Sequence, residues 1–323
     1  MRARPLLAAA AVGFTLLAAP ALYLTQPLPM PSRSRAEAPE VSPARLEAHV
    51  RALSERFAPR DYRHPENLDG ASAYVGGEFE RAGGAVAFQS FPAGSATYRN
   101  VIASFGPDTP ERIVVGAHYD AAGPHPAADD NASGVAGLIE LAHLLGRASL
   151  PVRVELVAYP LEEPPFFRTG QMGSAVHAGS LRREGVRVRA MLALEMIGYF
   201  SDAPGSQAFP VGILRAFYPS RGNFVLVAGQ MGQGSLVRRV KRAMRGGSAL
   251  PVRSINAPRW IPGIDFSDHV NYWDAGYDAA MITDTAFYRN PHYHTARDTP
   301  ETLDYARMAM VVQGVYAAVL ALA

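Results

Sequence analysis

The chain has 323 residues, of which 48% are apolar and 19% charged, which suits one large α/β domain or two small ones and excludes a disordered or fibrous protein. Its formal charge is only +2, and its 31 Lys and Arg residues form no aromatic-interleaved stripe of the kind that follows nucleic acid, so we expect no nucleic-acid partner. Because the chain has no cysteine, disulfides, Cys-type zinc sites and thiol nucleophiles are excluded, and any metal must be held by His, Asp and Glu.

The first 25 residues have the features of an export segment. Arg2 and Arg4 are basic, and residues 5–25 are almost wholly apolar and uncharged. Ala19-Pro20-Ala21 has the small residues of a signal-peptide cleavage site. The apolar run continues beyond it, however, to the ~20 residues that span a bilayer, which favours an uncleaved anchor. In either case we expect the rest of the chain to be exported, to the periplasm or the extracytoplasmic face of the membrane, with no other membrane contact.

Residues 26–42 are rich in Pro and polar residues, a composition typical of a linker. The folded domain is therefore predicted to cover residues 43–323, and no shift in composition marks a second domain within it. Ser42 has the position of a helix cap, with Pro at the first position of a predicted helix at 43–57. A second helix is predicted at 70–82.

After these two helices, strand and helix patterns alternate along the chain. Strands are predicted at 86–91, 99–105, 112–117, 153–158, 191–195, 224–228 and 279–282, and helices at 132–147, 172–183, 235–245 and 300–322. Such alternation predicts an α/β fold with a mostly parallel sheet covered on both faces. Ligand sites of such sheets lie beyond the carboxyl ends of the strands.

Acid or imidazole side chains follow three of the predicted strands. His118 directly follows one, Glu162 and Glu163 come shortly after the next, and Glu195 ends a third, so they should meet at one edge of the sheet. Asp130 lies in an Asp-Asp-Asn run that precedes a predicted helix, where capping alone would need one such side chain. Spacing leaves two later groups undecided, which are Ser267-Asp268-His269 and the pair His292 and His294.

Six short motifs in this order resemble those of the co-catalytic zinc aminopeptidases of bacterial leucyl aminopeptidase type, a superfamily that also includes glutamate carboxypeptidase and glutaminyl cyclase. The resemblance covers about residues 45–323. It implies a zinc-exopeptidase fold, three-layer α/β/α with a mixed, mostly parallel central sheet. The motifs are residues 116–120 (GAHYD), 128–134 (ADDNASG), 161–163 (LEE), 194–199 (LEMIGY), 267–269 (SDH) and 293–299 (YHTARDT).

The resemblance also implies roles for single residues. His118 and Glu195 would bind one Zn²⁺, Glu163 and His294 a second, and Asp130 both. Such a site hydrolyses the N-terminal bond of a peptide substrate by means of a hydroxide that bridges the two metals. Glu162 would be the general base that deprotonates the water and then protonates the leaving amine.

Three further residues are expected to support the ligands. Asp120, two residues beyond His118, is placed to accept the proton of the second ring nitrogen of that histidine. Asp268 and His269 are interpreted as neighbours of the metal ligands. Two departures from the commonest family pattern are Ala121 in place of Ser and Asn131 in place of a third Asp. In a third departure, Glu195 replaces the usual Asp and lengthens one ligand by a methylene.

Other readings remain open at this point. A glutaminyl cyclase would use one zinc for acyl transfer on N-terminal Gln, but its relatives usually carry Trp where Tyr293 stands. A receptor-like ectodomain without activity would have lost ligands that are present here. Phe166 and Phe167 either form the wall of a hydrophobic substrate pocket or pack the loop that follows Glu163. The preferred side chain, carboxypeptidase or dipeptidase selectivity and the oligomeric state stay undetermined.

Overall fold

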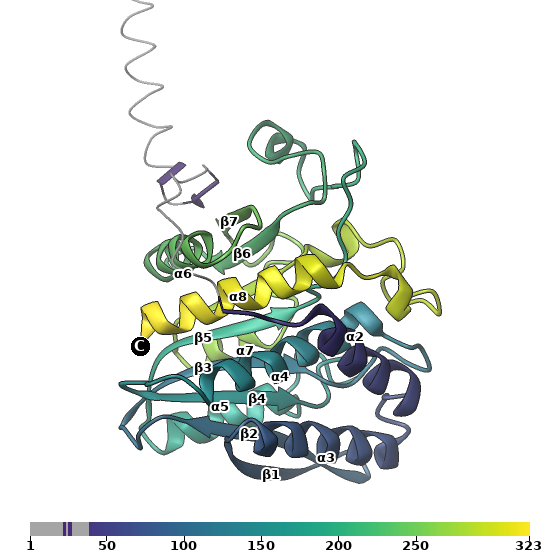
Figure 1. Ribbon diagram of the computed structural model, residues 1–323, viewed down its shortest axis with the longest axis vertical. Helices are drawn as coiled ribbons and strands as arrows, with labels where there is room; N and C mark the ends of the chain where they lie inside the picture. Colours follow the sequence, from purple (N-terminus) through teal and green to yellow (C-terminus); the bar gives the residue numbers. More distant parts are fainter. Residues whose placement is uncertain (1–21, 24, 28–38) are drawn as a thin grey trace, which may run out of the picture.

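The computed structural model describes residues 22–23, 25–27 and 39–323 (Figure 1). Most of the predicted export segment, and residues 28–38 of the predicted linker, lie outside the described residues.

One mixed sheet forms the centre of the domain. Its strands lie in the order β1-β2-β4-β3-β5-β8-β6-β7. Four central neighbours, β4, β3, β5 and β8, are mutually parallel, while β1, β2 and the β6–β8 pairing are antiparallel. The predicted mixed α/β sheet is therefore confirmed. Its strands are β1 (Ala85–Ala93), β2 (Ala96–Phe105), β3 (Glu111–His118), β4 (Arg153–Tyr159), β5 (Arg187–Glu195), β6 (Val225–Gln230), β7 (Val252–Ala257) and β8 (Ala279–Thr283).

Helices cover both faces of this sheet, which makes the three layers that were expected (Figure 1). Side chains of β3 alternate between the two cores: Ile113 and Val115 face one, and Val114 faces the other, as the period of a strand requires. The larger core is covered by α2 (Pro43–Arg51), α3 (Pro65–Arg81), α4 (Gly134–Leu145), α6 (Gly234–Gly247) and α8 (Tyr305–Leu322), and the smaller by α5 (Gly173–Arg183) and α7 (His269–Asp274).

The first two helices largely match their predictions. Ser42 caps α2 by accepting the backbone N–H of Arg45 at 3.3 Å, and a π-helical turn, η1 (Ala52–Arg56), continues α2. The second helix begins at Pro65 rather than at residue 70, since Pro favours the first helical turn.

The C-terminal half differs more from the predicted elements. The last predicted helix is divided into a short turn, η5 (Pro300–Thr302), and α8. Neither β7 nor the six-residue α7 was predicted. By length and apolar composition alone, α8 is the one described helix that could cross a membrane. Half of it is buried in the protein, where it packs against α4 and α6.

Strand order explains where the candidate residues meet. Because β4, β3, β5 and β8 are parallel neighbours, their carboxyl ends share one edge of the sheet. His118 and Glu195 are the last residues of β3 and β5, and the loops after β4 and β8 carry Glu163 and His294. Residues up to 176 positions apart in the chain are thus brought to one place.

Candidate metal centre

The five predicted metal ligands converge at this edge in two groups that share Asp130. Asp130 Oδ1 lies 3.3 Å from His118 Nε2, which is itself 3.5 Å from Glu195 Oε2. Asp130 Oδ2 lies 3.0 Å from His294 Nε2, which is 3.2 Å from Glu163 Oε1. One carboxylate therefore presents a different oxygen to each of two His–Glu pairs, which is the arrangement needed to bridge two ions.

Several donor atoms of this cluster lack a hydrogen-bond partner, and their chemistry suits metal ions. His118 Nε2, Glu163 Oε1 and His294 Nε2 are buried and have no hydrogen-bond partner among the described residues. Buried polar atoms are normally satisfied, so orphaned atoms that converge on one spot indicate a missing partner. Imidazole nitrogens and carboxylate oxygens, with no thiolate, are a donor set that zinc accepts.

Charges within the cluster are strongly coupled. Burial raises the pKa of Glu163 to about 7. Burial alone would lower the pKa of His294, but the neighbouring carboxylates of Asp130 and Glu163 raise it to about 10. In the protein without metal, protons on His294 and Glu163 therefore balance part of the negative charge of the cluster, and bound cations would replace those protons.

Glu162 lies beside the ligands and is itself buried. Its carboxylate forms a further group with His118 and Glu163, in which one donor atom of each lies within 4.8 Å of the others. Burial raises the pKa of Glu162 well above that of an ordinary carboxyl; the positive charge of His118 opposes this rise, whereas Glu163 and Glu195 add to it. A carboxyl with a raised pKa accepts a proton more readily than an ordinary one, as a general base must.

Asp120 does more than the sequence indicated. His118 Nδ1 lies 3.4 Å from Asp120 Oδ1 and 3.2 Å from the backbone oxygen of the same residue. The two carboxylate oxygens of Asp120 accept the backbone N–H groups of Glu162 and Glu163, each at 3.1 Å. Asp120 therefore connects the end of β3 to the loop that carries the predicted base and one predicted ligand.

A second carboxylate holds the Asp130 loop in the same way. Asp298 Oδ1 and Oδ2 accept the backbone N–H groups of Asp129 and Asp130, at 2.9 and 3.1 Å. Asn131 donates to Leu194 O at 2.8 Å and accepts the N–H of Gly134 at 3.0 Å. The helix-capping interpretation therefore applies to Asn131, while the Asp130 carboxylate faces the two histidines. Asp298 belongs to the motif at 293–299, and no role was predicted for it.

Three residues at these turns have a left-handed backbone. The φ angles of Leu161, Met196 and His294 are 65°, 49° and 55°, a region that non-glycine residues rarely occupy. Asn131 holds one of these turns, since its Oδ1 accepts the N–H of Met196 at 3.1 Å. Strained residues of this kind cluster at active sites.

The Ser267-Asp268-His269 motif lies between β7 and α7, and only its first two residues face the cluster of predicted ligands. Ser267 donates from Oγ to Glu195 Oε2 at 2.7 Å, a contact that was not predicted and that fixes one oxygen of a predicted ligand. Burial raises the pKa of Asp268 to about 7; the charge of His118 opposes this rise, and that of Glu195 adds to it. His269 instead packs edge-on against Trp273, and its Nε2 lies 2.8 Å from Ile264 O.

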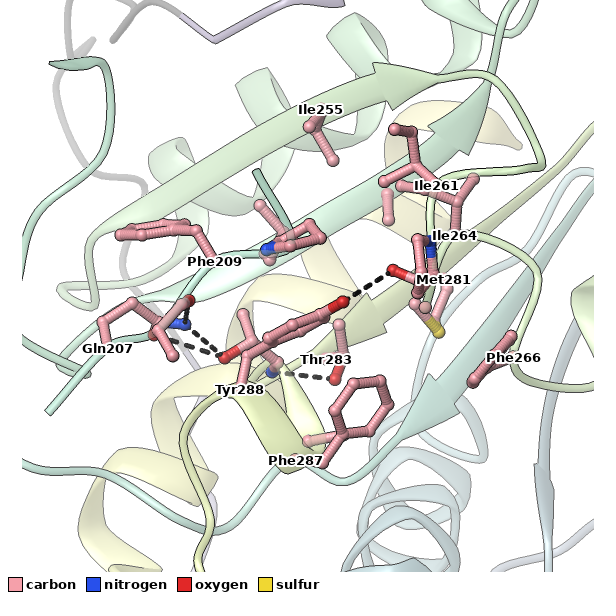
Figure 2. Close-up of a pocket in the computed structure, with 18 of the residues that line it drawn as sticks. Gln207, Phe209, Ile255, Ile261, Ile264, Phe266, Met281, Thr283, Phe287 and Tyr288 are labelled. Atoms are coloured by element: carbon pink, nitrogen blue, oxygen red, sulfur yellow. Dashed lines mark hydrogen bonds between the residues drawn. The ribbon is translucent and has the colours of Figure 1, made fainter. Parts of the chain in front are cut away.

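An apolar cavity of about 790 Å³, part of it open to solvent, adjoins Glu195. Figure 2 shows Phe209, Ile255, Ile261 and Met281 around it, with Phe287 and Tyr288 closing one side. Tyr293 also lines the cavity and stacks on His294 with ring centroids 3.7 Å apart. The cavity therefore joins the predicted metal ligands directly.

The two phenylalanines that follow Glu163 do not line this cavity. Phe166 packs its ring against Tyr62 and Tyr98, so it holds the loop in place. Phe167 contacts the ring of Phe266, which is a lining residue. The cavity walls come instead from segments 207–228, 255–266 and 281–293.

Known proteins resemble this chain in sequence and in fold. The uncharacterized protein YfbL of Escherichia coli strain K12 is 48% identical over 282 residues, 85% of this chain and 86% of that protein. Leucine aminopeptidase 1 of Ajellomyces dermatitidis strain ER-3 is 25% identical over 224 residues, 65% of this chain and 52% of that protein. The chain thus spans about half the length of the curated leucine aminopeptidases that it matches.

Solved structures share the fold at low sequence identity. The LapA aminopeptidase of Legionella pneumophila has a TM-score of 0.69 and 19% identity, and 88% of this chain and 72% of that chain are covered. A glutaminyl cyclase of Bacteroides thetaiotaomicron has a TM-score of 0.66 and 19% identity, covering 88% of this chain and 99% of that one. Residues 100–319, which include all five predicted ligands, match peptidase family M28, and we conclude that the chain belongs to this family.

Proposed function

We propose that this protein is a zinc-dependent exopeptidase that removes the N-terminal residue of short peptides. The observation that carries the proposal is the position of Asp130, whose two oxygens face two separate His–Glu pairs. Membership of a peptidase family and similarity to leucine aminopeptidases support a hydrolase of peptide bonds.

In this proposal each zinc ion would be held by three protein side chains, one of which would be shared between the two ions. His118, Glu195 and Asp130 would hold one ion, and Glu163, His294 and Asp130 the other, as their spacing suggests. When bound, the two ions would polarise the scissile carbonyl and lower the pKa of the attacking water toward ~7.

Glu162 is proposed to move the proton. Its buried carboxylate would accept a proton from the attacking water and deliver it to the nitrogen of the leaving amine. Asp120 orients this group, because it holds the backbone N–H of Glu162 at 3.1 Å. The raised pKa of Glu162 suits a group that must both accept and return a proton.

The apolar cavity suggests which N-terminal residues bind. It is lined by large apolar and aromatic side chains such as Phe209, Ile261 and Met281, and it adjoins Glu195. An N-terminal Leu, Met or Phe side chain would be desolvated there at about 25 cal/mol per Å² of buried apolar surface. The free amine would lie near the carboxylates, so that an N-blocked peptide is excluded.

Glutaminyl cyclase activity is the alternative, since a cyclase shares the fold. The duplicated His–Glu pairs around Asp130 favour the peptidase, because a one-zinc cyclase has no need of a bridging carboxylate. A receptor-like ectodomain is disfavoured, because the five predicted ligand side chains and Glu162 are all present and lie together.

The test uses matched peptides and product masses. The full-length protein is incubated with Leu-, Phe- and Gln-initiated peptides, free and N-acetylated, with and without a chelator. Release of free Leu and Phe from the unblocked peptides, lost with chelator and restored by zinc, is expected. Cleavage of the acetylated peptides would contradict aminopeptidase selectivity, and pyroglutamyl product without free amino acids would identify a cyclase.

A variant separates catalysis from metal binding. Glu162→Gln should retain its zinc yet lose about 10²–10⁴-fold in kcat, the range of a general base. The exposed Glu80→Gln, in α3, is the control and should leave kcat unchanged. Normal turnover by Glu162→Gln would refute the proposed role.

We further propose that residues 1–25 export the protein and that the peptidase domain lies outside the cytoplasm. The support is the sequence alone: two Arg residues followed by an uncharged apolar run. Cell fractionation with protease accessibility tests this, and a domain protected inside intact spheroplasts would contradict it.

A further inference from the structure

Charge is divided very unevenly between two parts of the chain. Residues 203–264 contain nine Lys and Arg residues and no Asp or Glu. The other 22 basic residues and all 29 acidic residues lie elsewhere, so the rest of the chain has a formal charge of −7. This basic segment includes β6, α6 and β7, which lie at one end of the molecule, opposite β1 and α3 (Figure 1). The small net charge therefore conceals a strongly polarised molecule.

Five of these basic residues belong to α6. Its apolar side is buried against the core, whereas Arg238, Arg239 and Arg242 follow the i, i+3 and i+4 spacing of one helix face. Arg239 and Arg242 are exposed, and Arg238 is half-buried. None of these three arginines forms an ion pair within the described part of the chain. Their charges are thus available to an anionic partner.

The chain that leaves the apolar N-terminal segment is attached to this same helix. The Arg238 guanidinium lies 4.3 Å above the ring of Tyr23. Gln26 O accepts hydrogen bonds from Lys241 Nζ at 3.2 Å and from Ser254 Oγ at 2.9 Å, and all three residues are buried. The contact is therefore specific, and it fixes Tyr23 and Gln26 beside α6.

We propose that the basic face of α6 lies on an anionic phospholipid bilayer, the one that residues 5–25 enter. A polybasic helix next to an anchor is attracted to anionic headgroups. Tyr side chains prefer the headgroup level of a bilayer, and Tyr23 is 60% exposed and therefore free to lie there. The domain would then touch the membrane through α6 as well as through residues 5–25, which revises the expectation of a single membrane contact, and β1 and α3 would point away from the bilayer. This proposal rests on residues 5–25 staying attached as an uncleaved membrane anchor, and it is independent of the peptidase activity.

The test exploits the absence of cysteine, because one introduced thiol is the only thiol in the protein. Ser235→Cys is exposed and shares the helix face of Arg238, Arg239 and Arg242. The full-length variant is placed in nanodiscs of phosphatidylcholine alone or mixed with phosphatidylglycerol. Its rate of reaction with a neutral polyethylene-glycol maleimide is then measured. Labelling should be slower in the anionic discs, and ~1 M salt should remove the difference, since it shortens the screening length to about 3 Å.

Two controls distinguish a specific face from general charge attraction. Ser95→Cys lies in the β1–β2 turn at the far edge of the sheet and should react equally in both lipids. Each basic residue at an anionic surface strengthens membrane binding about fivefold. Arg239→Gln together with Arg242→Gln should therefore reduce the protection of Ser235→Cys from labelling about 25-fold. Arg147→Gln with Arg183→Gln removes the same charge from two exposed sites elsewhere and should preserve the protection.

Equal labelling of Ser235→Cys in the two lipids would overturn the proposal. So would an equal loss of protection in the two double variants, because net charge alone would then explain the binding. Peptide hydrolysis is measured separately on the same samples, so the labelling result can be interpreted even if the proposed activity is not found.

Discussion

Asp120 provides the sharpest test of how the structure supports the metal centre. Asp120 is 2% exposed, and its two carboxylate oxygens accept the buried backbone N–H groups of Glu162 and Glu163. In Asp120→Asn, the amide oxygen can keep one of these bonds, but the NH₂ group then faces the other N–H donor. In Asp120→Ala both donors lose their partner.

The expected costs follow from these contacts. A hydrogen bond to a charged group contributes about 1.5–3 kcal/mol, and an unsatisfied buried donor costs about 1–3 kcal/mol. We therefore expect Asp120→Asn to lower the free energy of unfolding by about 2 kcal/mol and Asp120→Ala by about 4 kcal/mol. The exposed Asp108→Asn should change it by less than about 0.5 kcal/mol.

Urea unfolding of the metal-free variants measures these differences without the added stability of metal binding. In addition, zinc affinity should fall by about 10–100-fold in both Asp120 variants, because His118 and Glu163 lose a support. If Asp120→Ala were no less stable than Asp108→Asn, the two backbone contacts would not be holding the loop, and the reasoning would fail.

Three further predictions follow from single contacts. Ser267→Ala should weaken zinc binding by about 10–100-fold in a chelator competition, because it frees the Glu195 oxygen held at 2.7 Å. Gly116→Ala should cost at least about 1–3 kcal/mol in urea unfolding, since the new methyl would lie 2.2 Å from the buried Tyr159 ring. Burial lowers the pKa of His177 to about 3, so as the pH falls this histidine is protonated in the unfolded chain before it is protonated in the folded protein. Its stability contribution is complete above pH ~6.5 and falls by up to about 1.4 kcal/mol per pH unit toward pH 3, a loss that unfolding of His177→Gln should lack.

Each of these has a clear contrary result. Unchanged zinc affinity in Ser267→Ala would mean that Glu195 is positioned by other contacts. A Gly116→Ala protein of normal stability would require β4 to move. Equal pH slopes in His177→Gln and the native protein would assign the acid sensitivity to other groups.

Local sequence patterns were sufficient for much of the fold and for the candidate residues. Apolar runs that end in His118 or Glu195 identify both the strands and the edge of the sheet at which they stop. This works because strand periodicity and strand ends are properties of short segments. The roles of the five ligands came from a resemblance in six ordered motifs. The match to peptidase family M28 confirms the family, while the individual roles stay predictions.

The sheet order decided what the sequence could not. Placing β6 antiparallel to β8 folds segments 207–228 and 255–266 onto the side of Glu195, so the cavity walls are formed by stretches that share no local pattern. The contacts of Asp120 and Asp298 with backbone N–H groups were equally invisible, since such contacts require two loops to meet in space. Residue types and strand ends are encoded locally, whereas the partner of each buried polar group depends on which distant segments the tertiary fold brings together.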